Sequence, residues 1–184
     1  MINHSRILIG NFNLIELLMN RLNQKNLSNS IIISGNKGIG KATFSFFLIN
    51  KILNSFEKKD SINKHTNLIY NNSHPNIRYI TNTLDEKSDK IKTNISIDQI
   101  RSLENFLYQS SFDNLPKFVI IDSADDLNIN AANTLLKNLE EPKKNTFFIL
   151  LAHQISTLLP TIRSRCINFF LEKPNISNFT KILT

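Results

Sequence analysis

The sequence predicts an α/β fold in which helices cover both faces of a parallel sheet. Three short runs, Ile31–Ile33, Phe118–Ile121 and Phe147–Leu151, consist only of apolar residues and indicate buried strands. Segments with apolar residues at helical spacing separate these runs. Strands that are apolar on both faces and alternate with helices are typical of a parallel sheet between two helical layers.

The first half of the chain is predicted to contain two helices, a strand and a glycine loop. The first helix is indicated by apolar residues at helical spacing: Phe12, Ile15, Leu18, Met19 and Leu22. The strand Ile31–Ile33 leads into the loop 35–40, and residues 41–53 are predicted as an apolar-rich helix. Residues 54–74 are polar with little periodicity, which predicts a surface loop, and residues 76–81 alternate as a candidate strand.

The second half begins with the polar stretch 82–94, which is expected to be solvated. Asp98 is predicted to cap the next helix. The apolar positions of this helix are Ile100, Leu103, Phe106 and Leu107. Another helix is expected from about Asn130 to Glu141, where Pro142 ends it. Residues 166–171 are predicted as a fourth buried strand.

The composition is that of an ordinary globular protein, with 41% hydrophobic and 20% charged residues. The apolar runs are far shorter than the roughly 20 residues of a membrane-spanning helix. The N-terminus lacks the pattern of a secretory signal. The single cysteine, Cys166, excludes an internal disulfide and a multi-thiolate zinc site. We therefore expect a cytoplasmic protein that holds no zinc and does not enter a membrane.

The chain is basic, with 22 Lys and Arg against 15 Asp and Glu and a net charge of +7. A basic surface attracts polyanions through Coulomb forces and counterion release, which makes DNA a plausible partner. The chain is also heavy in Asn, Ile, Lys and Phe, and such a bias adds lysine everywhere without forming a binding face. The charge alone leaves both interpretations open.

Three of the four glycines, Gly35, Gly38 and Gly40, fall within six residues between a strand and a helix. Glycine permits positive φ and lets peptide N–H groups approach a phosphate, while the next helix directs its dipole at the anion. With Lys41, the segment satisfies G-x-x-x-x-G-K, whose lysine binds the β- and γ-phosphates. ATP or ADP is therefore the candidate ligand. A tight turn without a nucleotide is the alternative.

The residue after this lysine departs from the motif. Ser or Thr, whose hydroxyl holds Mg²⁺, is expected there, but the chain has Ala42. Thr43 follows, and it points about 100° away around the helix, so it does not simply substitute. The candidate nucleotide-binding residues, functional or vestigial, are Gly35, Gly38, Gly40, Lys41, Thr43 and Asp122.

The strand Phe118–Ile121 ends in the carboxylate of Asp122, which is the form of a Walker B element that handles Mg²⁺. An ATPase of this kind normally continues with Glu, which activates the attacking water, whereas this chain has Ser123. Loss of such a base typically costs about 10²–10⁴ in rate. Asp125 and Asp126 are expected to begin the next loop and to point elsewhere. Damage to both Mg²⁺-handling elements argues against independent hydrolysis. A strand that ends in a turn-forming Asp is the alternative.

Several longer strings add a more specific signal. They are Ile9–Asn11, Gly35–Thr43, His74–Asn76, Ile97–Arg101, Ile120–Asp125, Ala132–Pro142 and Leu159–Cys166. In this order they resemble the delta-prime family of bacterial DNA polymerase III clamp-loader subunits. The helix string AANTLLKNLEEP followed by TIRSRC is highly specific, and the resemblance covers roughly residues 6–171.

The resemblance implies an AAA+ core over residues 1–171, which in this family is followed by a helical lid and a collar domain. We expect residues 172–184 to be the start of a truncated lid and the collar domain to be absent, which departs from the family. It also implies a place in a pentameric loader that opens the sliding clamp and places it on primed DNA. The expected partners are the tau/gamma motor subunits and the delta subunit. In this family the arginine of a Ser-Arg-Cys motif reaches into the ATP site of the adjacent motor subunit, and by motif match it is Arg165. A guanidinium supplied in trans can contribute about 10³–10⁵ in rate. A surface or helix-capping arginine is the alternative.

Three departures favour the delta-prime type over the motor subunits, which keep Gly-Lys-Ser/Thr, Asp-Glu and a four-cysteine zinc module. This chain has Ala42 and Ser123 instead, and it has no cysteine between Leu53 and Ile97. His153 follows the third strand at the usual sensor position, and we assign it no catalytic role. The expected function is a non-hydrolysing subunit of a DNA polymerase III complex. The alternatives are an autonomous P-loop ATPase, a truncated tau/gamma-like motor subunit and a simple DNA-binding module.

Overall fold

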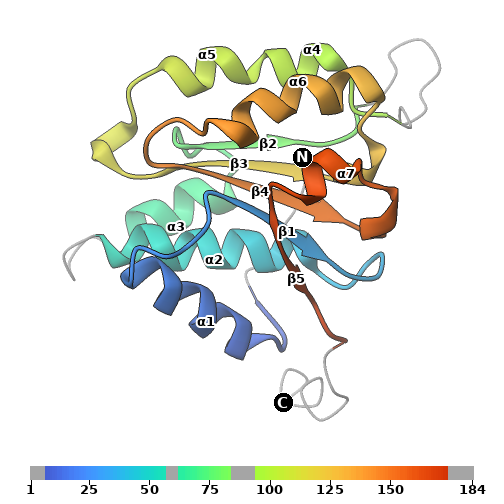
Figure 1. Cartoon of the computed structure of the whole chain (residues 1–184). Helices are drawn as coiled ribbons and strands as arrows, with labels where there is room; N and C mark the ends of the chain where they lie inside the picture. The colour runs from blue at the N-terminus through green and yellow to red at the C-terminus, as the bar shows by residue number, and fades with distance from the viewer. Residues whose placement is uncertain (1–6, 57–61, 84–93, 174–184) are drawn as a thin grey trace.

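The computed structural model describes residues 7–56, 62–83 and 94–173. Its centre is a five-stranded parallel sheet in the order β2-β3-β4-β1-β5 (Figure 1). The strands are β1 (Ser30–Ser34), β2 (Ile77–Ile80), β3 (Lys117–Asp122), β4 (Thr146–Ala152) and β5 (Ile167–Phe170). The α-helices are α1 (Phe12–Asn23), α2 (Lys41–Ser55), α3 (Ile62–Tyr70), α4 (Ile97–Arg101), α5 (Leu103–Tyr108), α6 (Ile129–Glu140) and α7 (Pro160–Arg163).

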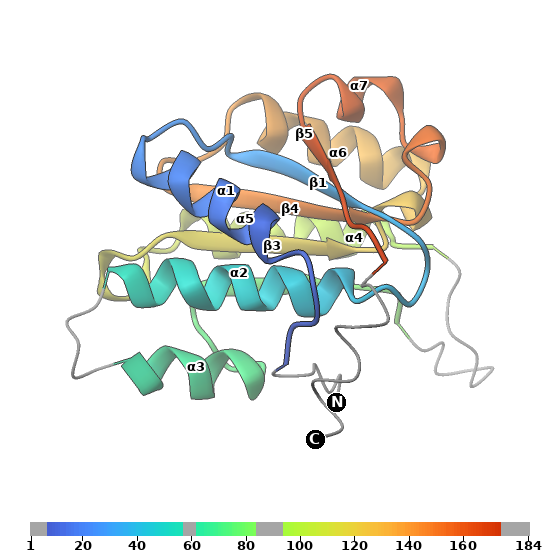
Figure 2. The same cartoon turned by 90° about the horizontal axis from the view of Figure 1, so that it is seen from below.

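Two helical layers enclose the sheet, because successive side chains of a strand point to opposite faces. Ile31 and Ile33 of β1 pack into an apolar cluster with α1, α2 and α3, whereas Ile32 joins a second cluster with α4, α5, α6 and α7. Figure 1 shows these two layers on opposite sides of the sheet, and Figure 2 shows α2 lying between α1 and α3. The predicted α/β architecture with helices on both faces is confirmed.

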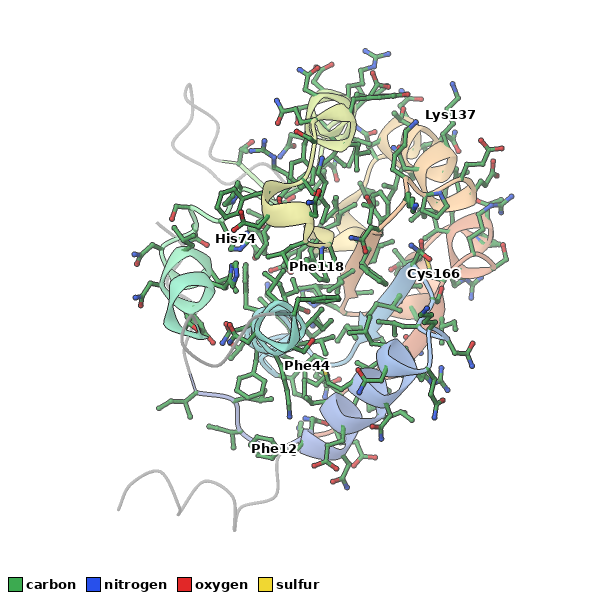
Figure 3. The ribbon with its side chains drawn as sticks, turned by 90° about the vertical axis from the view of Figure 1, so that its left-hand side faces the viewer. Phe12, Phe44, His74, Phe118, Lys137 and Cys166 are labelled. Carbon is green, nitrogen blue, oxygen red and sulfur yellow. The ribbon has the colours of Figure 1, made fainter. Side chains whose placement is uncertain are left out.

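The interior lies where the apolar runs of β1, β3 and β4 predict it, but the prediction of a fourth buried strand over 166–171 is wrong, because β5 is an edge strand whose residues are mostly exposed. Figure 3 shows Phe44 of α2 and Phe118 of β3 inside the molecule, and neither side chain has solvent-exposed surface. Lys137 projects outward from α6, which lies on the face of the sheet opposite to α2. Phe12 lies at the start of α1 and is exposed. The central strands are therefore apolar on both faces because each face is covered.

The stretch 54–74 is not a surface loop, because it contains α3. This helix buries His65 and Ile69. His65 Nδ1 lies 2.9 Å from Nε2 of His74, which is also buried. His65 takes a buried position of α3 that an apolar side chain usually fills, so apolar spacing alone did not indicate this helix.

The helix after residue 94 is not capped by Asp98. Ser96 is the N-cap of α4: its hydroxyl accepts from the Gln99 N–H, and the Gln99 side chain accepts from the Ser96 N–H. Asp98 lies in the first turn, where its carboxylate is 3.6 Å from Arg101. The four predicted apolar positions are all buried, but they are divided between α4 and α5, which meet at Ser102.

Two expectations fall partly on residues that the structure does not describe. Residues 174–184 of the expected lid lie outside the described residues, as do residues 84–93 of the polar stretch 82–94. No helix in the described part of the chain is both long and apolar enough to cross a bilayer.

Candidate functional site

The glycine loop joins β1 to α2 at the edge of the sheet where the parallel strands end. Gly40 is the N-cap of α2 with φ of 94°, and Gly35 has φ of 153°. Residues with a Cβ rarely adopt either value. A Cβ at Gly35 would also lie only 3.1 Å from the carbonyl oxygen of Leu171, which follows β5. The loop backbone therefore requires glycine at these two positions.

Lys41, the first residue of α2, is buried, and its ammonium group is fully engaged. Its Nζ donates to the carbonyl oxygens of Gly35 at 2.8 Å and Asn36 at 3.1 Å. A third contact joins Nζ to Nδ1 of His153 at 2.7 Å. Burial lowers the pKa of Lys41, and the charges of Asp122 and Asp125 oppose this effect. An ammonium group has three N–H donors, and all three have partners here.

His153 follows β4 and links the loop lysine to the end of β3. Since its Nδ1 accepts from the Lys41 ammonium, the neutral ring carries its proton on Nε2. Nε2 lies 3.1 Å from the hydroxyl of Ser123. The Ser123 hydroxyl in turn lies 3.5 Å from Oδ1 of Asp122. His153 is therefore part of the polar network of the site, and its contacts give it no catalytic role.

Asp122 is the last residue of β3, and its second carboxylate oxygen, Oδ2, accepts a hydrogen bond from a tyrosine. The hydroxyl of Tyr79, on the neighbouring strand β2, donates to Oδ2 of Asp122 at 2.5 Å. Burial raises the pKa of the Tyr79 phenol, and the adjacent Asp122 charge raises it further. The phenol therefore keeps its proton and acts as a donor to the carboxylate.

The prediction that Asp125 points away from the site is wrong. Its Oδ2 accepts a hydrogen bond from the backbone N–H of His153 at 3.1 Å, and its charge acts on Lys41. Asp126 does point elsewhere, because its Oδ2 accepts from the side chain of Asn82 at 2.7 Å. The turn Ala124–Asp126 that follows β3 is helical, which sends consecutive carboxylates in different directions.

A pocket of about 450 Å³ lies beside the glycine loop. Its walls come from the loop, the start of α2 and the segments near both ends of the described chain. They include Gly38, Gly40, Thr43, Ile9 and Leu171. Thr43 faces this pocket, whereas the ammonium of Lys41 is bonded to His153. The pocket has the size of a small-molecule site and adjoins the backbone expected to hold phosphates.

The residues present do not fit a Mg²⁺–triphosphate complex of the usual P-loop kind. Position 42 is alanine and supplies no hydroxyl. Both oxygens of Asp122 lie near protein hydroxyl groups, and each N–H of Lys41 has a protein partner. Among the residues that the structure describes, no three His, Cys, Asp or Glu side chains are grouped as metal ligands.

Arg165 lies on the other helical layer, two residues after the end of α7, and is exposed. Its Nη2 is 2.6 Å from Oε1 of Glu140, the last residue of α6. Its Nη1 donates to the carbonyl oxygen of Thr161 at 2.9 Å and lies 3.3 Å from the hydroxyl of Ser164. Ser164 and Arg165 are therefore at the surface, whereas Cys166 is only partly exposed and packs against an apolar cluster.

The predicted site residues thus separate into two places. Lys41 and Asp122 come together through His153 and Ser123 at the carboxyl ends of β1, β3 and β4. Arg165 belongs to a separate cluster with Glu140. The sequence did not single out Tyr79, and it placed His153 after the third strand without a catalytic role. Their signal was a polar residue at the carboxyl end of a buried parallel strand, which is where open α/β sheets place their ligands.

Comparison with known proteins identifies the family of the chain. The family model described as DNA polymerase III, delta subunit matches residues 10–175. The DNA polymerase III subunit delta-prime of Pseudomonas aeruginosa is 48% identical over 73 residues, covering 40% of this chain and 22% of that protein. The corresponding subunit of Bacillus subtilis is 31% identical over 154 residues, covering 82% of this chain and 44% of that protein. The chain therefore spans less than half the length of either relative.

Similarity to solved structures identifies the fold. A gamma subunit-related protein of DNA polymerase III from Thermotoga maritima superposes with a TM-score of 0.66 at 27% identity, covering 88% of this chain and 46% of that one. The RuvB Holliday junction branch migration motor of Thermotoga maritima gives a TM-score of 0.62 at 14% identity, covering 95% of this chain and 49% of that one. These neighbours confirm the AAA+ fold. The chain belongs to the DNA polymerase III delta-subunit family, and its predicted resemblance to the delta-prime subunits is confirmed.

Proposed function

We propose that this chain is a clamp-loader subunit of the delta-prime type, which does not hydrolyse ATP and supplies Arg165 to a neighbouring motor subunit. Its partners in this proposal are the tau/gamma motor and delta subunits, with the sliding clamp and primed DNA bound by the assembled complex. Such a subunit acts in the bacterial cytoplasm, where the DNA is. The relatives named delta-prime support the assignment.

The observation that carries the proposal is the contrast between the two clusters. The chain's own Lys41 and Asp122 are held in a network of protein groups at the glycine loop, whereas Arg165, although it is paired with Glu140, lies at the surface. Phosphoryl transfer builds negative charge on the equatorial oxygens, and an arginine supplied by another subunit stabilises this charge. The arrangement supports giving a catalytic group to a partner and argues against using one internally.

The test compares wild type with Arg165→Ala in a complex reconstituted with motor and delta subunits from the same source. Arg163→Ala is the matched control, because Arg163 is also an exposed arginine of the same segment. We expect Arg165→Ala to lower DNA-stimulated ATP hydrolysis and clamp loading without preventing assembly. At the one affected site the loss should approach about 10³-fold or more. Unchanged turnover in an intact complex would reject the arginine-finger role.

An autonomous P-loop ATPase and a truncated tau/gamma-like motor subunit are the competing proposals for the glycine loop. Both require the purified chain to hydrolyse ATP and to lose this activity with Lys41→Ala. We expect no activity above that of the Lys41→Ala variant, because Ala42 and Ser123 replace the residues that handle the metal and the attacking water. This assay measures hydrolysis, and binding of ATP or ADP without hydrolysis needs its own measurement.

A simple DNA-binding module is the remaining alternative, and the net charge of +7 motivates it. It predicts that the isolated chain binds DNA with an affinity that falls steeply as salt rises. The clamp-loader proposal instead places DNA contact in the assembled complex. Binding by the isolated chain that matches binding by the complex would favour the module.

A further inference from the structure

The polar residues around the glycine loop form one connected network that occupies the positions where a P-loop contacts its ligand. In a G-x-x-x-x-G-K loop, the lysine ammonium binds the β- and γ-phosphates. The ammonium of Lys41 instead contacts Nδ1 of His153 at 2.7 Å, and its other two N–H groups are bound to loop carbonyls. A terminal phosphate would have to displace the imidazole to gain this contact.

Protein groups also contact the carboxylate that would be expected to serve Mg²⁺. The Asp at the end of this strand normally serves Mg²⁺. Oδ2 of Asp122 instead accepts a 2.5 Å hydrogen bond from Tyr79, and its Oδ1 lies 3.5 Å from Ser123. Because the partly buried phenol keeps its proton, the carboxylate is stabilised by a hydrogen bond that needs no metal.

Room for the rest of a nucleotide remains. The pocket of about 450 Å³ lies beside the loop, and its walls include the apolar side chains Ile7, Leu8, Ile9 and Leu171. Apolar walls suit a flat base, and the backbone at Gly38 and Gly40 faces the same space. Neither His153 nor Tyr79 lines this pocket.

We propose that His153 and Tyr79 close the terminal-phosphate and metal positions of the loop, so that the chain takes a nucleotide without Mg²⁺ and without preference for a third phosphate. ATP and ADP then bind alike, held by the pocket and the loop backbone. This inference deepens the non-hydrolysing part of the proposed function and does not depend on Arg165.

The test measures binding of ATP and of ADP to the full chain by calorimetry, with Mg²⁺ and with chelator. Wild type should show equal and Mg²⁺-independent affinities for the two nucleotides, and an absence of binding to both would overturn the proposal that the chain takes a nucleotide. His153→Ala should bind ATP about 10- to 100-fold more tightly than wild type, the range that one hydrogen bond to a charged group provides. Gln154→Ala is the matched control, since Gln154 is the exposed neighbour of His153.

Two further variants show which residues carry the effect. Lys41→Ala combined with His153→Ala should lose the gain, because the freed contact runs through the lysine. Tyr79→Phe keeps the ring and removes the hydroxyl, and ATP binding to this variant should become Mg²⁺-dependent. Circular dichroism and thermal unfolding confirm that each variant is folded.

The outcomes separate this inference from the proposed function. Strong preference of wild type for Mg²⁺–ATP, or ATP binding by His153→Ala that equals wild type or stays undetectable, would overturn the closure. Hydrolysis of ATP by the wild-type chain alone would overturn the non-hydrolysing function itself. Absence of hydrolysis together with an unresponsive His153→Ala variant overturns only the inference.

Discussion

Glu140 at the end of α6 holds the guanidinium of Arg165, with 2.6 Å between Oε1 and Nη2. A carboxylate at a helix C-terminus faces the negative end of the helix dipole, so a nearby arginine offsets an unfavourable position. The two side chains are 35% and 47% exposed for Arg165 and Glu140 respectively. An ion pair this exposed contributes only about 0.2–1 kcal/mol. The contact therefore restrains Arg165 only weakly in the free chain and can yield to a stronger anion.

Glu140→Gln is expected to raise ATP hydrolysis in the reconstituted clamp-loader complex, by up to about fivefold. The paired carboxylate cancels charge that Arg165 would otherwise offer to the neighbouring phosphate, and about 1 kcal/mol corresponds to this factor. Steady-state ATPase with primed DNA measures it, and Glu141→Gln is the control for removing a nearby exposed carboxylate. A fall to the level of Arg165→Ala would show that Glu140 positions the arginine rather than restraining it.

Gly40→Ala and Gly35→Ala are expected to destabilise the fold by different amounts. At Gly40, with φ of 94°, no heavy atom lies within 4 Å of an added Cβ, so the cost is the backbone term of about 1–2 kcal/mol. At Gly35 the Cβ would also press on the Leu171 carbonyl at 3.1 Å, which adds steric strain. Urea unfolding of both variants checks the order. Equal losses would mean that the β5 end moves aside freely.

His65→Ala is expected to cost about 1–3 kcal/mol of unfolding free energy. Nδ1 of His74 accepts from the backbone N–H of Asn76 at 3.1 Å, so its ring carries the proton on Nε2 and donates to His65. Removal of His65 leaves this buried donor without its acceptor, which is the costly case for a hydrogen bond. Chemical denaturation measures the loss. The Thr66→Ala variant, at a part-buried hydroxyl of the same helix, should lose less.

The thiol of Cys166 is expected to resist alkylation in the folded chain. Burial raises its pKa to about 12, and the thiolate is the reactive form. At pH 8 the thiolate fraction is then about 10³-fold or more below that of an ordinary cysteine of pKa about 8.5. The rate with iodoacetamide should rise about tenfold per pH unit from 7 to 9, with no levelling near 8.5. Fast labelling at pH 8 that matches the urea-unfolded chain would contradict this.

Much of the fold followed from local pattern. The runs at 31–33, 118–121 and 147–151 lie inside β1, β3 and β4, since a strand buried on both faces must be apolar at successive positions. The pattern failed at α3, where the buried groups that matter are the imidazoles of His65 and His74. Polar burial depends on a partner elsewhere in the chain, and residue spacing does not reveal that partner.

The motif His74–Asn76 illustrates the same limit for the site. The sequence singled it out through resemblance, and the structure gives it a structural role. The Asn76 side chain accepts from the N–H of Phe112 at 2.7 Å and donates to its carbonyl oxygen at 2.9 Å. It therefore ties the start of β2 to the turn before β3. Resemblance located the residues, and only their contacts distinguished support from chemistry.

The sequence by itself determined the layered architecture, the glycine loop, the carboxylate at the end of β3 and the family of the chain. Each of these depends on residues that are close together in the sequence. Tertiary structure alone decided the partners: Lys41 with His153 across 112 positions and Tyr79 with Asp122 across 43. Strand order and parallel register bring these side chains to one edge of the sheet. No spacing along the chain carries that information, since it arises from how the strands pair.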